Sequence, residues 1–249
     1  MPTNEHGQPI GPPVAGWTTR PRPPRTPITG RFCRVEPIDP DRHAADLHAA
    51  NTDPASWTYL VYGPFDELET YRRWLVEKAA SPDPLFYAIV DNTGGRAVGV
   101  AAYMRIDPPN GVMEVGHLNF SPALQRTAAA TEAMYLMMRR AFDELGYRRY
   151  EWKCDSLNAP SRRAAVRLGF NYEGLFRQAT VYKNRSRDTA WFSIVDSEWP
   201  ARKKAFERWL APENFDAAGR QRRPLAEFMG DVSERPDGRD GDSGSRGRG

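Results

Sequence analysis

The stretch from Met113 to Phe170 constrains the fold of this chain more than any other part. Its pattern predicts a strand, a tight loop, an amphipathic helix, a second strand and a short capped helix, in that order. A loop that leads into a helix N-terminus directs backbone N–H groups and the positive end of the helix dipole toward one point, where phosphate binds well. A second helix N-terminus follows one strand later. Two such ends on one side of a sheet can hold a long phosphorylated cofactor.

The two helices of this stretch have clear beginnings and ends in the sequence. The first follows Thr131, and its apolar residues recur in one stripe at helical spacing: Met134, Met137, Met138, Ala141, Phe142 and Leu145. Gly146 stands where a glycine commonly ends a helix. For the second helix, Asn158 is a good N-cap and Gly169 lies just past the end. Between the helices, residues 149–154 alternate between aromatic or thiol and charged side chains, which predicts a strand with two different faces.

The rest of the chain adds antiparallel strands before this stretch and a hairpin after it. Alternation and turn residues predict strands over residues 31–36, 85–91, 97–106, 112–120, 171–182 and 188–195. Helical spacing predicts further helices over residues 40–50, 64–80 and 198–210. Antiparallel strands followed by strand–helix–strand crossovers give a mixed sheet with helices on both faces, which is an α/β fold.

Two short motifs within this stretch carry a family resemblance. The loop before the first helix reads Gln125-Arg126-Thr127-Ala128-Ala129-Ala130, and Asn158 and Ser161 precede Leu168-Gly169-Phe170. In this order and spacing the segment resembles the GNAT superfamily of N-acetyltransferases, in the branch similar to the ribosomal-protein N-terminal acetyltransferases. The resemblance covers roughly residues 30 to 200. It implies a mostly antiparallel sheet with a splayed central parallel strand pair, and acetyl-CoA as the co-substrate.

The resemblance implies cofactor-binding residues on the central strand, in the loop and at the second helix. They are Leu118, Asn119, Phe120, Gln125, Arg126, Thr127, Ala128, Ala129, Ala130, Thr131, Asn158 and Ser161. The loop departs from the family pattern, because Ala128 and Ala130 occupy its two glycine positions. Glycine permits positive φ and a close approach of phosphate, but alanine also serves where φ is negative. The alternative is that the loop is only a polar turn that starts a helix.

The resemblance also implies three residues for the chemistry. Glu114 is the first choice for the base that removes the amine proton through water, and His117 is the second because it titrates in the right range. Many relatives place a tyrosine at the position of Ala165 as the acid for the departing thiolate, and here Ser161 is the replacement. The ordinary alternatives are a solvated strand residue for Glu114, a core or surface histidine for His117, and a capping-turn residue for Ser161. Asn158 binds the pantetheine amides, caps its helix, or does both.

Four aromatic residues lie in the segment that covers the acceptor site in relatives: Trp57, Tyr59, Tyr62 and Phe65. They are expected to line an acceptor pocket or to belong to the core.

The length of 249 residues and a hydrophobic fraction of 40% suit one domain with tails. We expect a flexible Pro-rich arm over residues 1–27, the acetyltransferase domain over residues 28–215, and a disordered, charged, Gly-rich tail over residues 216–249. Trp17 is the exception in the arm, because a large apolar side chain can dock on the domain.

Several functions are disfavoured by what the sequence lacks. The net charge of +3 comes without a nucleic-acid recognition motif, so we expect no nucleic-acid partner. The four histidines lack metal-ligand spacing, which argues against a metal site. No apolar run suits a membrane span or a signal peptide, which favours a cytoplasmic protein without membrane contact. Cys33 and Cys154 sit in strand-like runs, where buried reduced thiols are expected.

These observations favour an acetyl-CoA-dependent N-acetyltransferase, monomeric or homodimeric, that transfers the acetyl group directly to a primary amine. No nucleophile with an adjacent base appears, which disfavours an acyl-enzyme. The acceptor is a protein N-terminus, an amino acid or a small amine. The alternative is a non-catalytic acyl-CoA-binding or regulatory module of the same fold. A third hypothesis is an interaction protein whose basic tails recruit an acidic partner.

Overall fold

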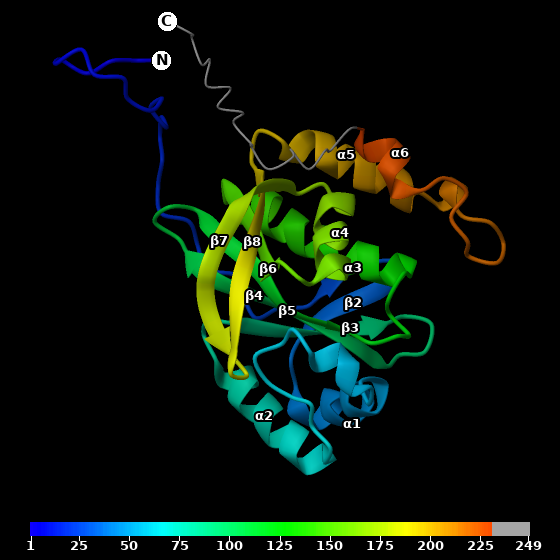
Figure 1. Ribbon diagram of the computed structural model, residues 1–249. Coiled ribbons are helices and arrows are strands. Elements are labelled where there is room, and N and C mark those ends of the chain that lie inside the picture. Colours follow the sequence, from blue (N-terminus) through cyan, green and yellow to red (C-terminus); the bar gives the residue numbers. More distant parts are fainter. Residues whose placement is uncertain (231–249) are drawn as a thin grey trace, which may run out of the picture.

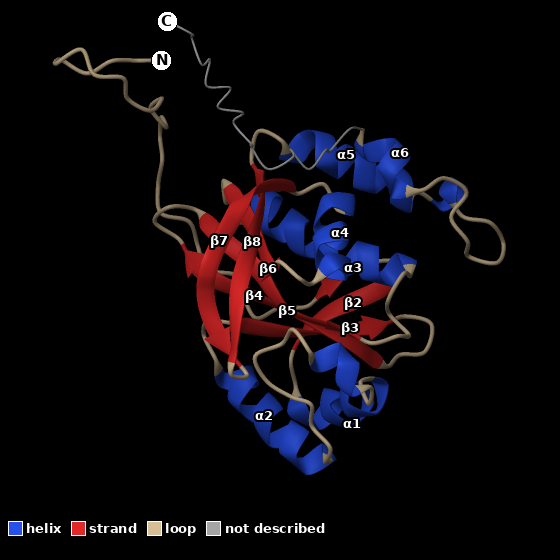
Figure 2. Ribbon diagram, viewed as in Figure 1, coloured by secondary structure: helices blue, strands red, loops and turns tan. Residues whose placement is uncertain are grey.

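The computed structural model describes residues 1–230, and residues 231–249 lie outside the described part. An eight-stranded sheet forms its centre, in the order β1-β2-β3-β4-β5-β6-β8-β7 (Figures 1 and 2). The strands are β1 (Ile28–Thr29), β2 (Cys33–Pro37), β3 (Leu85–Asp91), β4 (Ala97–Asp107), β5 (Val112–Phe120), β6 (Arg149–Asp155), β7 (Asn171–Tyr182) and β8 (Arg185–Val195). Neighbouring strands are antiparallel except β5 and β6. The mostly antiparallel sheet with a central parallel pair is therefore confirmed.

Helices cover both faces of the sheet, as Figure 1 shows. One face carries α1 (Pro40–Ala50), the 3-10 turn η1 (Pro54–Trp57) and α2 (Leu68–Ala80). The other face carries α3 (Ala128–Arg139) with its π-helical continuation η2 (Arg140–Glu144), α4 (Ala159–Arg167), α5 (Trp199–Leu210), the short turn η3 (Pro212–Asn214) and α6 (Leu225–Met229). Each face has its own hydrophobic core, and the core around α3 is the larger one.

Helix α3 lies deepest in the molecule. Met134, Met137 and Met138 of its predicted stripe are at most 1% exposed. The buried carboxylate of Glu132 accepts hydrogen bonds from the backbone N–H groups of residues 31, 32 and 33, and so ties α3 to the start of β2. Gly146, with φ of 68°, ends the helical run as predicted. These contacts fix the N-terminus of α3 relative to the sheet.

Helix α2 begins at Leu68, not at the predicted Pro64. The cause is Trp57, whose buried ring fills the space next to Gly63. A Cβ added to Gly63 would lie 2.4 Å from this ring, and Gly63 has φ of +64°. The chain therefore wraps around the indole before it can become helical.

The predicted N-terminal arm is docked on the domain from Trp17 onward. The indole N–H of Trp17 donates to the carbonyl of Pro109 at 2.8 Å, and the hydroxyl of Tyr87 donates to the carbonyl of Pro24 at 2.8 Å. The guanidinium of Arg140 donates to the carbonyls of residues 26 and 27. The docking of Trp17 thus extends through the second half of the arm.

The tail boundary expected at residue 215 needs correction. Helix α6 packs on α5 and buries Leu225 to 1% and Met229 to 8% exposure. Arg202 of α5 also donates to the carbonyl of Met229, the last residue of α6, at 3.5 Å. The short apolar pattern around Leu225 gains its burial from α5, a contact that composition does not reveal. The rest of the predicted tail, residues 231–249, lies outside the described residues.

Candidate active site

Strands β5 and β6 pair along only part of their length. The pairing runs from Val112 with Arg149 to Val115 with Trp152, although β5 continues to Phe120. Beyond this point β5 continues to pair with β4 but no longer with β6, and we call the interval between β5 and β6 the gap. Because the strands are parallel, α3 and α4, which follow them, begin at the same edge of the sheet (Figure 1). The gap and two helix N-termini therefore share one side of the domain.

A β-bulge on β5 lies beside the gap. Val100 of β4 pairs with Asn119 and Ala102 pairs with Gly116, so β5 has one extra residue in this interval. His117 adopts the left-handed backbone conformation, with φ of 52°. The bulge places backbone polar groups of His117 and Leu118 outside the regular ladder, beside the gap.

The three predicted cofactor residues of β5 point to different faces. Leu118 and Phe120 pack against the core around α3. Asn119 is opposite Val100, on the face of α1 and α2, and is 4% exposed. Its Oδ1 has no hydrogen-bond partner among residues 1–230. A buried amide oxygen without a partner is costly, so Asn119 is the polar side chain of this strand that a ligand would best satisfy.

The loop before α3 contains no glycine, and its backbone still leads directly into the helix N-terminus. Thr127 caps the helix, with its hydroxyl accepting from the N–H of Ala130 at 3.2 Å. The left-handed conformation occurs at Arg126, with φ of 62°, while Ala128 and Ala130 are helical. Alanine is therefore compatible with the two positions where the family pattern has glycine. The N–H groups of Ala128 and Ala129 have no acceptor among the described residues, as expected for a free helix N-terminus.

The side chains around this loop are basic or neutral. Gln125 donates to the carbonyl of Phe120 at 2.7 Å and so ties the loop to the end of β5. Arg167, at the end of α4, donates to the hydroxyl of Thr131 at 2.9 Å, and no carboxylate of the described chain pairs with it. A cation without a counter-charge at a helix N-terminus suits a phosphate ligand. Sequence reasoning missed Arg167, because only the packing of α4 beside α3 brings it there.

Ser161 and Asn158 lie at the N-terminus of α4. The amide oxygen of Asn158 accepts from the N–H of Ser161 at 3.1 Å, so Asn158 caps the N-terminus of α4. The hydroxyl of Ser161 accepts from the indole N–H of Trp152 at 3.0 Å. Ala165, where relatives carry a tyrosine, is completely buried against the core.

Glu114 is buried on the opposite face of the sheet and is held by two cations. Its Oε2 lies 2.6 Å from a guanidinium nitrogen of Arg105 and 2.9 Å from Nζ of Lys153. Lys153 also pairs with Glu151 at 2.7 Å. The other oxygen of Glu114, Oε1, would lie 3.6 Å from a Cβ added to Gly116, where the two strands separate. Glu114 is thus a paired buried carboxylate and not the solvated strand residue of the alternative.

His117 belongs to an aromatic cluster on the face of α1 and α2. Its ring stacks on Tyr62 at 5.5 Å between centroids and lies 4.9 Å from the ring of Phe86. Burial, together with the charges of Lys78 and Arg105, lowers the pKa of His117 to about 4. The imidazole is therefore neutral at pH 7 and can accept a proton only weakly.

The four aromatic residues of the 57–65 segment divide between core and surface. Trp57 is 3% exposed, and Tyr62 and Phe65 pack against the same core. The hydroxyl of Tyr59 donates to the carbonyl of Leu157 at 3.1 Å, in the connection between β6 and α4. The segment thus crosses from the aromatic cluster to the far side of the gap.

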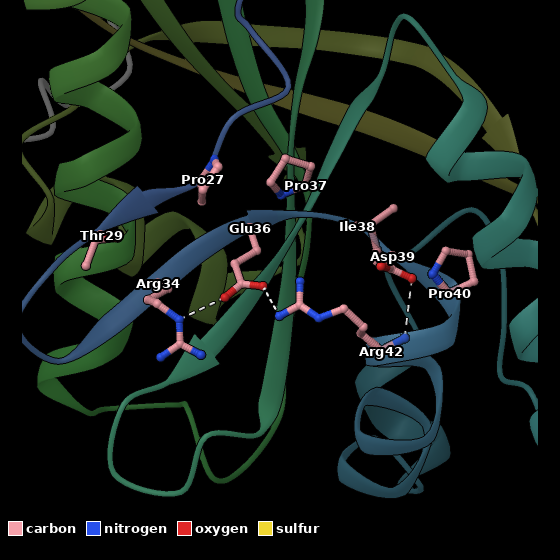
Figure 3. A pocket seen from close by; sticks show the side chains of 9 residues that line it. All are labelled: Pro27, Thr29, Arg34, Glu36, Pro37, Ile38, Asp39, Pro40 and Arg42. Carbon is pink, nitrogen blue, oxygen red and sulfur yellow. Dashed lines mark hydrogen bonds and ion pairs between the residues drawn. The ribbon is translucent and has the colours of Figure 1, made fainter.

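A shallow hollow near β2 lies away from this site. Figure 3 shows the carboxylate of Glu36 between Arg34 and Arg42, at 2.8 and 2.7 Å. Burial opposes ionisation there, but the two arginines outweigh it and hold the pKa of Glu36 below its usual value. In the sheet, β3 and β4 separate β2 from β5. The charges of the hollow satisfy one another, and it takes no part in the site at the gap.

Comparisons with known proteins agree on one family. Residues 34–171 match the family described as the acetyltransferase (GNAT) domain. A GCN5-related N-acetyltransferase from Brucella melitensis is 49% identical, with a TM-score of 0.85, over 87% of this chain and 99% of that one. A GNAT-family protein from Chromobacterium violaceum is 43% identical, with a TM-score of 0.73, over 78% of this chain and 98% of that one. The uncharacterized N-acetyltransferase p20 of Bacillus licheniformis is 24% identical over 59% of this chain and 84% of its own length.

The chain belongs to the GNAT family of acetyltransferases. It is an acyltransferase that depends on acetyl-CoA, so the enzyme class predicted from the sequence is confirmed and the non-catalytic alternative is not favoured. Within residues 1–230, no helix combines the length and apolar character that crossing a membrane requires.

Proposed function

We propose that the enzyme transfers the acetyl group of acetyl-CoA directly to a primary amine in the gap between β5 and β6. The observation that carries this proposal is the separation of the strands after Val115 and Trp152, next to the N-termini of α3 and α4. Within residues 1–230 the donors around the loop are free N–H groups and arginines, and the first turn of α3 has no acidic residue, which suits the phosphates of acetyl-CoA.

In this proposal the α3 side binds the phosphates. The N–H groups of Ala128 and Ala129 and the side chains of Arg126 and Arg167 are the phosphate donors. The backbone N–H groups of the bulge at residues 117–118 polarise the thioester carbonyl, because they border the gap outside the ladder. The side-chain amide of Asn158, which caps α4, also contacts the pantetheine arm.

Ser161 assists the leaving thiolate. Its hydroxyl oxygen already accepts from Trp152, so its proton remains for a sulfur acceptor, either the neighbouring thiol of Cys154 or the sulfur of the co-substrate. As the amine nitrogen attacks the carbonyl carbon, the C–S bond breaks and negative charge develops on sulfur. A hydroxyl donor and the positive end of the α4 dipole both stabilise that charge.

The amine proton leaves on the opposite face of the sheet. Oε1 of Glu114 faces Gly116 at the opening of the gap, and a water molecule relays the proton to it. Arg105 and Lys153 keep the carboxylate in place. His117, neutral and beside the same opening, is the second candidate for the base.

Neither cysteine supports a covalent intermediate. Burial raises the pKa of both the Cys33 and Cys154 thiols, so little thiolate forms at pH 7. Buried, reduced cysteines also accord with a cytoplasmic location, which we propose together with a monomeric or homodimeric state. The acceptor is a protein N-terminus, an amino acid or a small amine.

Product analysis and intact-protein mass spectrometry test this proposal together. Incubation with acetyl-CoA and an amine panel should release CoA and acetylated amine in equal amounts. Incubation with acetyl-CoA alone should leave the protein mass unchanged. A stable or transient acetyl-protein adduct formed without acceptor, and consumed on adding it, would replace direct transfer by a covalent route.

A further inference from the structure

A ring of contacts surrounds the gap on the face opposite the phosphate loop. His117 of β5 stacks on Tyr62, and the segment that carries Tyr62 continues back to Trp57. The tip of the β7–β8 hairpin contacts this segment through two hydrogen bonds. Nζ of Lys183 donates to the carbonyl of Trp57 at 2.8 Å, and the guanidinium of Arg185 donates to the carbonyl of residue 58 at 2.6 Å. The long hairpin reaches toward the helices of that face in Figure 1.

The hairpin closes the ring on the β6 side. The hydroxyl of Tyr182 donates to Oδ2 of Asp155 at 2.7 Å, at the end of β6. The opening between β5 and β6 is therefore bounded by β5, the 57–62 segment, the hairpin tip and the end of β6. The hairpin tip therefore lies at the end of β6 that does not pair with β5.

The hairpin tip carries three cations that form no ion pair within the described part of the chain, Lys183, Arg185 and Arg187. Their hydrogen bonds go to neutral groups: two backbone carbonyls, and the hydroxyl of residue 189 for Arg187. No salt bridge joins any of the three to a carboxylate within residues 1–230. We call these three side chains the basic tip.

Two carboxylates of the adjoining strands, Asp155 of β6 and Asp188 of β8, accept hydrogen bonds from neutral donors. Asp155 accepts from Tyr182 and from the N–H of Leu157, and Asp188 accepts from the N–H of Gln178 at 2.7 Å. Burial and the neighbouring Arg185 lower the pKa of Lys183, as expected where positive charge is not neutralised. Three cations against these two carboxylates leave the hairpin tip with a net positive charge.

The side chains of the basic tip are held in place. Lys183 and Asn184 form the two-residue turn with φ of 48° and 59°, a left-handed conformation that non-glycine residues seldom adopt. The guanidinium groups of Arg185 and Arg187 lie 5.0 and 6.0 Å from the ring centroid of Tyr182. Cations held by packing and hydrogen bonds lose less entropy on binding an anion than cations on free side chains.

We propose that the acceptor amine carries an anionic group, a carboxylate or a phosphate, and that the basic tip binds it. This inference rests on the proposed function, since it names the class of acceptor for the same gap. An anion at the tip leaves the amine of the same molecule pointing into the opening, toward Glu114 and the thioester. A neutral amine of the same size lacks this anchor.

Matched acceptors test the proposal on the enzyme itself. Amino acids are compared with their amides, and phosphoethanolamine with ethanolamine, using wild type, Arg187→Gln, Arg185→Gln and the control Arg96→Gln. Arg96 lies exposed at the β3–β4 turn, so its variant removes the same charge elsewhere. The KM for the anionic amine should rise about 10-fold or more in the tip variants and stay unchanged in the control, as loss of a charge-assisted hydrogen bond predicts. An equal rise in KM for neutral amines would mean that the basic tip only holds the 57–62 segment in place. That result would overturn the proposal.

Anion binding provides a second test that does not depend on turnover. Protein saturated with CoA, so that the α3 site is filled, is titrated by calorimetry with inorganic phosphate and separately with succinate. Wild type and Arg96→Gln should bind at least one of these anions, about 10-fold more tightly than Arg187→Gln and Arg185→Gln do. The anion that binds distinguishes phosphate from carboxylate. Absent binding, or equal binding in all four proteins, contradicts the basic tip as an anion site. Failure of CoA to bind in the first step would instead contradict the proposed function.

Discussion

The indole N–H of Trp152 donates a 3.0 Å hydrogen bond to the hydroxyl of Ser161, from the end of the β5–β6 pairing to the first turn of α4. Trp152 is the residue of β6 at which the two strands separate. The same side chain thus marks the opening of the gap and occupies one acceptor site of the serine hydroxyl. This leaves the serine as a donor toward sulfur.

Replacing Ser161 with alanine should lower kcat by about 10- to 100-fold, because one donor to the developing thiolate is lost. It should also cost about 1 kcal/mol of stability, because the indole N–H of Trp152 loses its acceptor. Steady-state kinetics with acetyl-CoA and thermal unfolding check both parts. Ser197→Ala, at an exposed position after β8, is the control and should behave as wild type. A kcat within twofold of wild type in Ser161→Ala would remove this hydroxyl from the mechanism.

Replacing Lys153 with methionine should destabilise the domain by about 3–5 kcal/mol, because the buried carboxylates of Glu114 and Glu151 both lose a cation. Chemical denaturation measures the free energy of unfolding. Lys204→Met, which removes an exposed lysine of α5, should cost less than about 0.5 kcal/mol. Equal stability of the two variants would show that the Lys153 ion pairs contribute nothing.

The burial of His117 predicts a pH-dependent part of the stability. Its pKa of about 4 in the folded protein lies below the ordinary value of 6.5, so the unfolded chain binds the proton more readily between these values. The contribution of the neutral His117 side chain to the free energy of unfolding is complete above pH 6.5. It falls as the pH drops toward 4. Relative to His117→Gln, wild type should lose about 3 kcal/mol over that range. His6→Gln, at the exposed N-terminus, is the control, and a parallel pH dependence of wild type and His117→Gln would contradict the assignment.

Arg167→Met should weaken acetyl-CoA binding by about 10-fold, because a phosphate loses a charge-assisted hydrogen bond. Arg163→Met removes an exposed arginine from the same helix and should bind within about twofold of wild type. The dissociation constant is measured by calorimetry. The slope of affinity against salt should fall only in Arg167→Met, and the same slope in both variants would argue against a phosphate contact by Arg167.

Much of the fold follows from periodicity and capping residues. The stripe of Met134, Met137 and Met138 predicts the buried helix α3, and the alternation of residues 149–154 predicts β6, because burial on a helix face or a sheet face leaves a regular trace in the sequence. The boundaries that were wrong include the start of β8, which is Arg185 and not residue 188, the start of α2 and the extent of the tail. The start of α2 and the extent of the tail depend on contacts with distant residues, Trp57 for α2 and α5 for α6.

For the site, too, local features could be predicted from the sequence and contacts between distant residues could not. The loop at Gln125 and the cap at Asn158 are local features, and the sequence indicates both. Arg105, Lys153 and Arg167 reach their partners across strands or between helices, at sequence separations that no local pattern encodes. The capping role of Asn158 is present in the structure, whereas the chemical roles of Glu114, His117 and Ser161 stay predictions.

The measurement that tests the central claim most directly is calorimetric titration of wild type and Ala128→Pro with acetyl-CoA. Proline is favoured at the first position of a helix, and Thr127 before it already has the extended backbone, with φ of −98° and ψ of 166°, that proline requires. The substitution therefore removes one N–H while keeping α3, and Ala128→Ser keeps the N–H as a matched control. We expect wild type and Ala128→Ser to bind acetyl-CoA alike and Ala128→Pro to bind about 10-fold or more weakly. Equal affinity in all three proteins, with Ala128→Pro as stable as wild type, would contradict the N-terminus of α3 as the phosphate site.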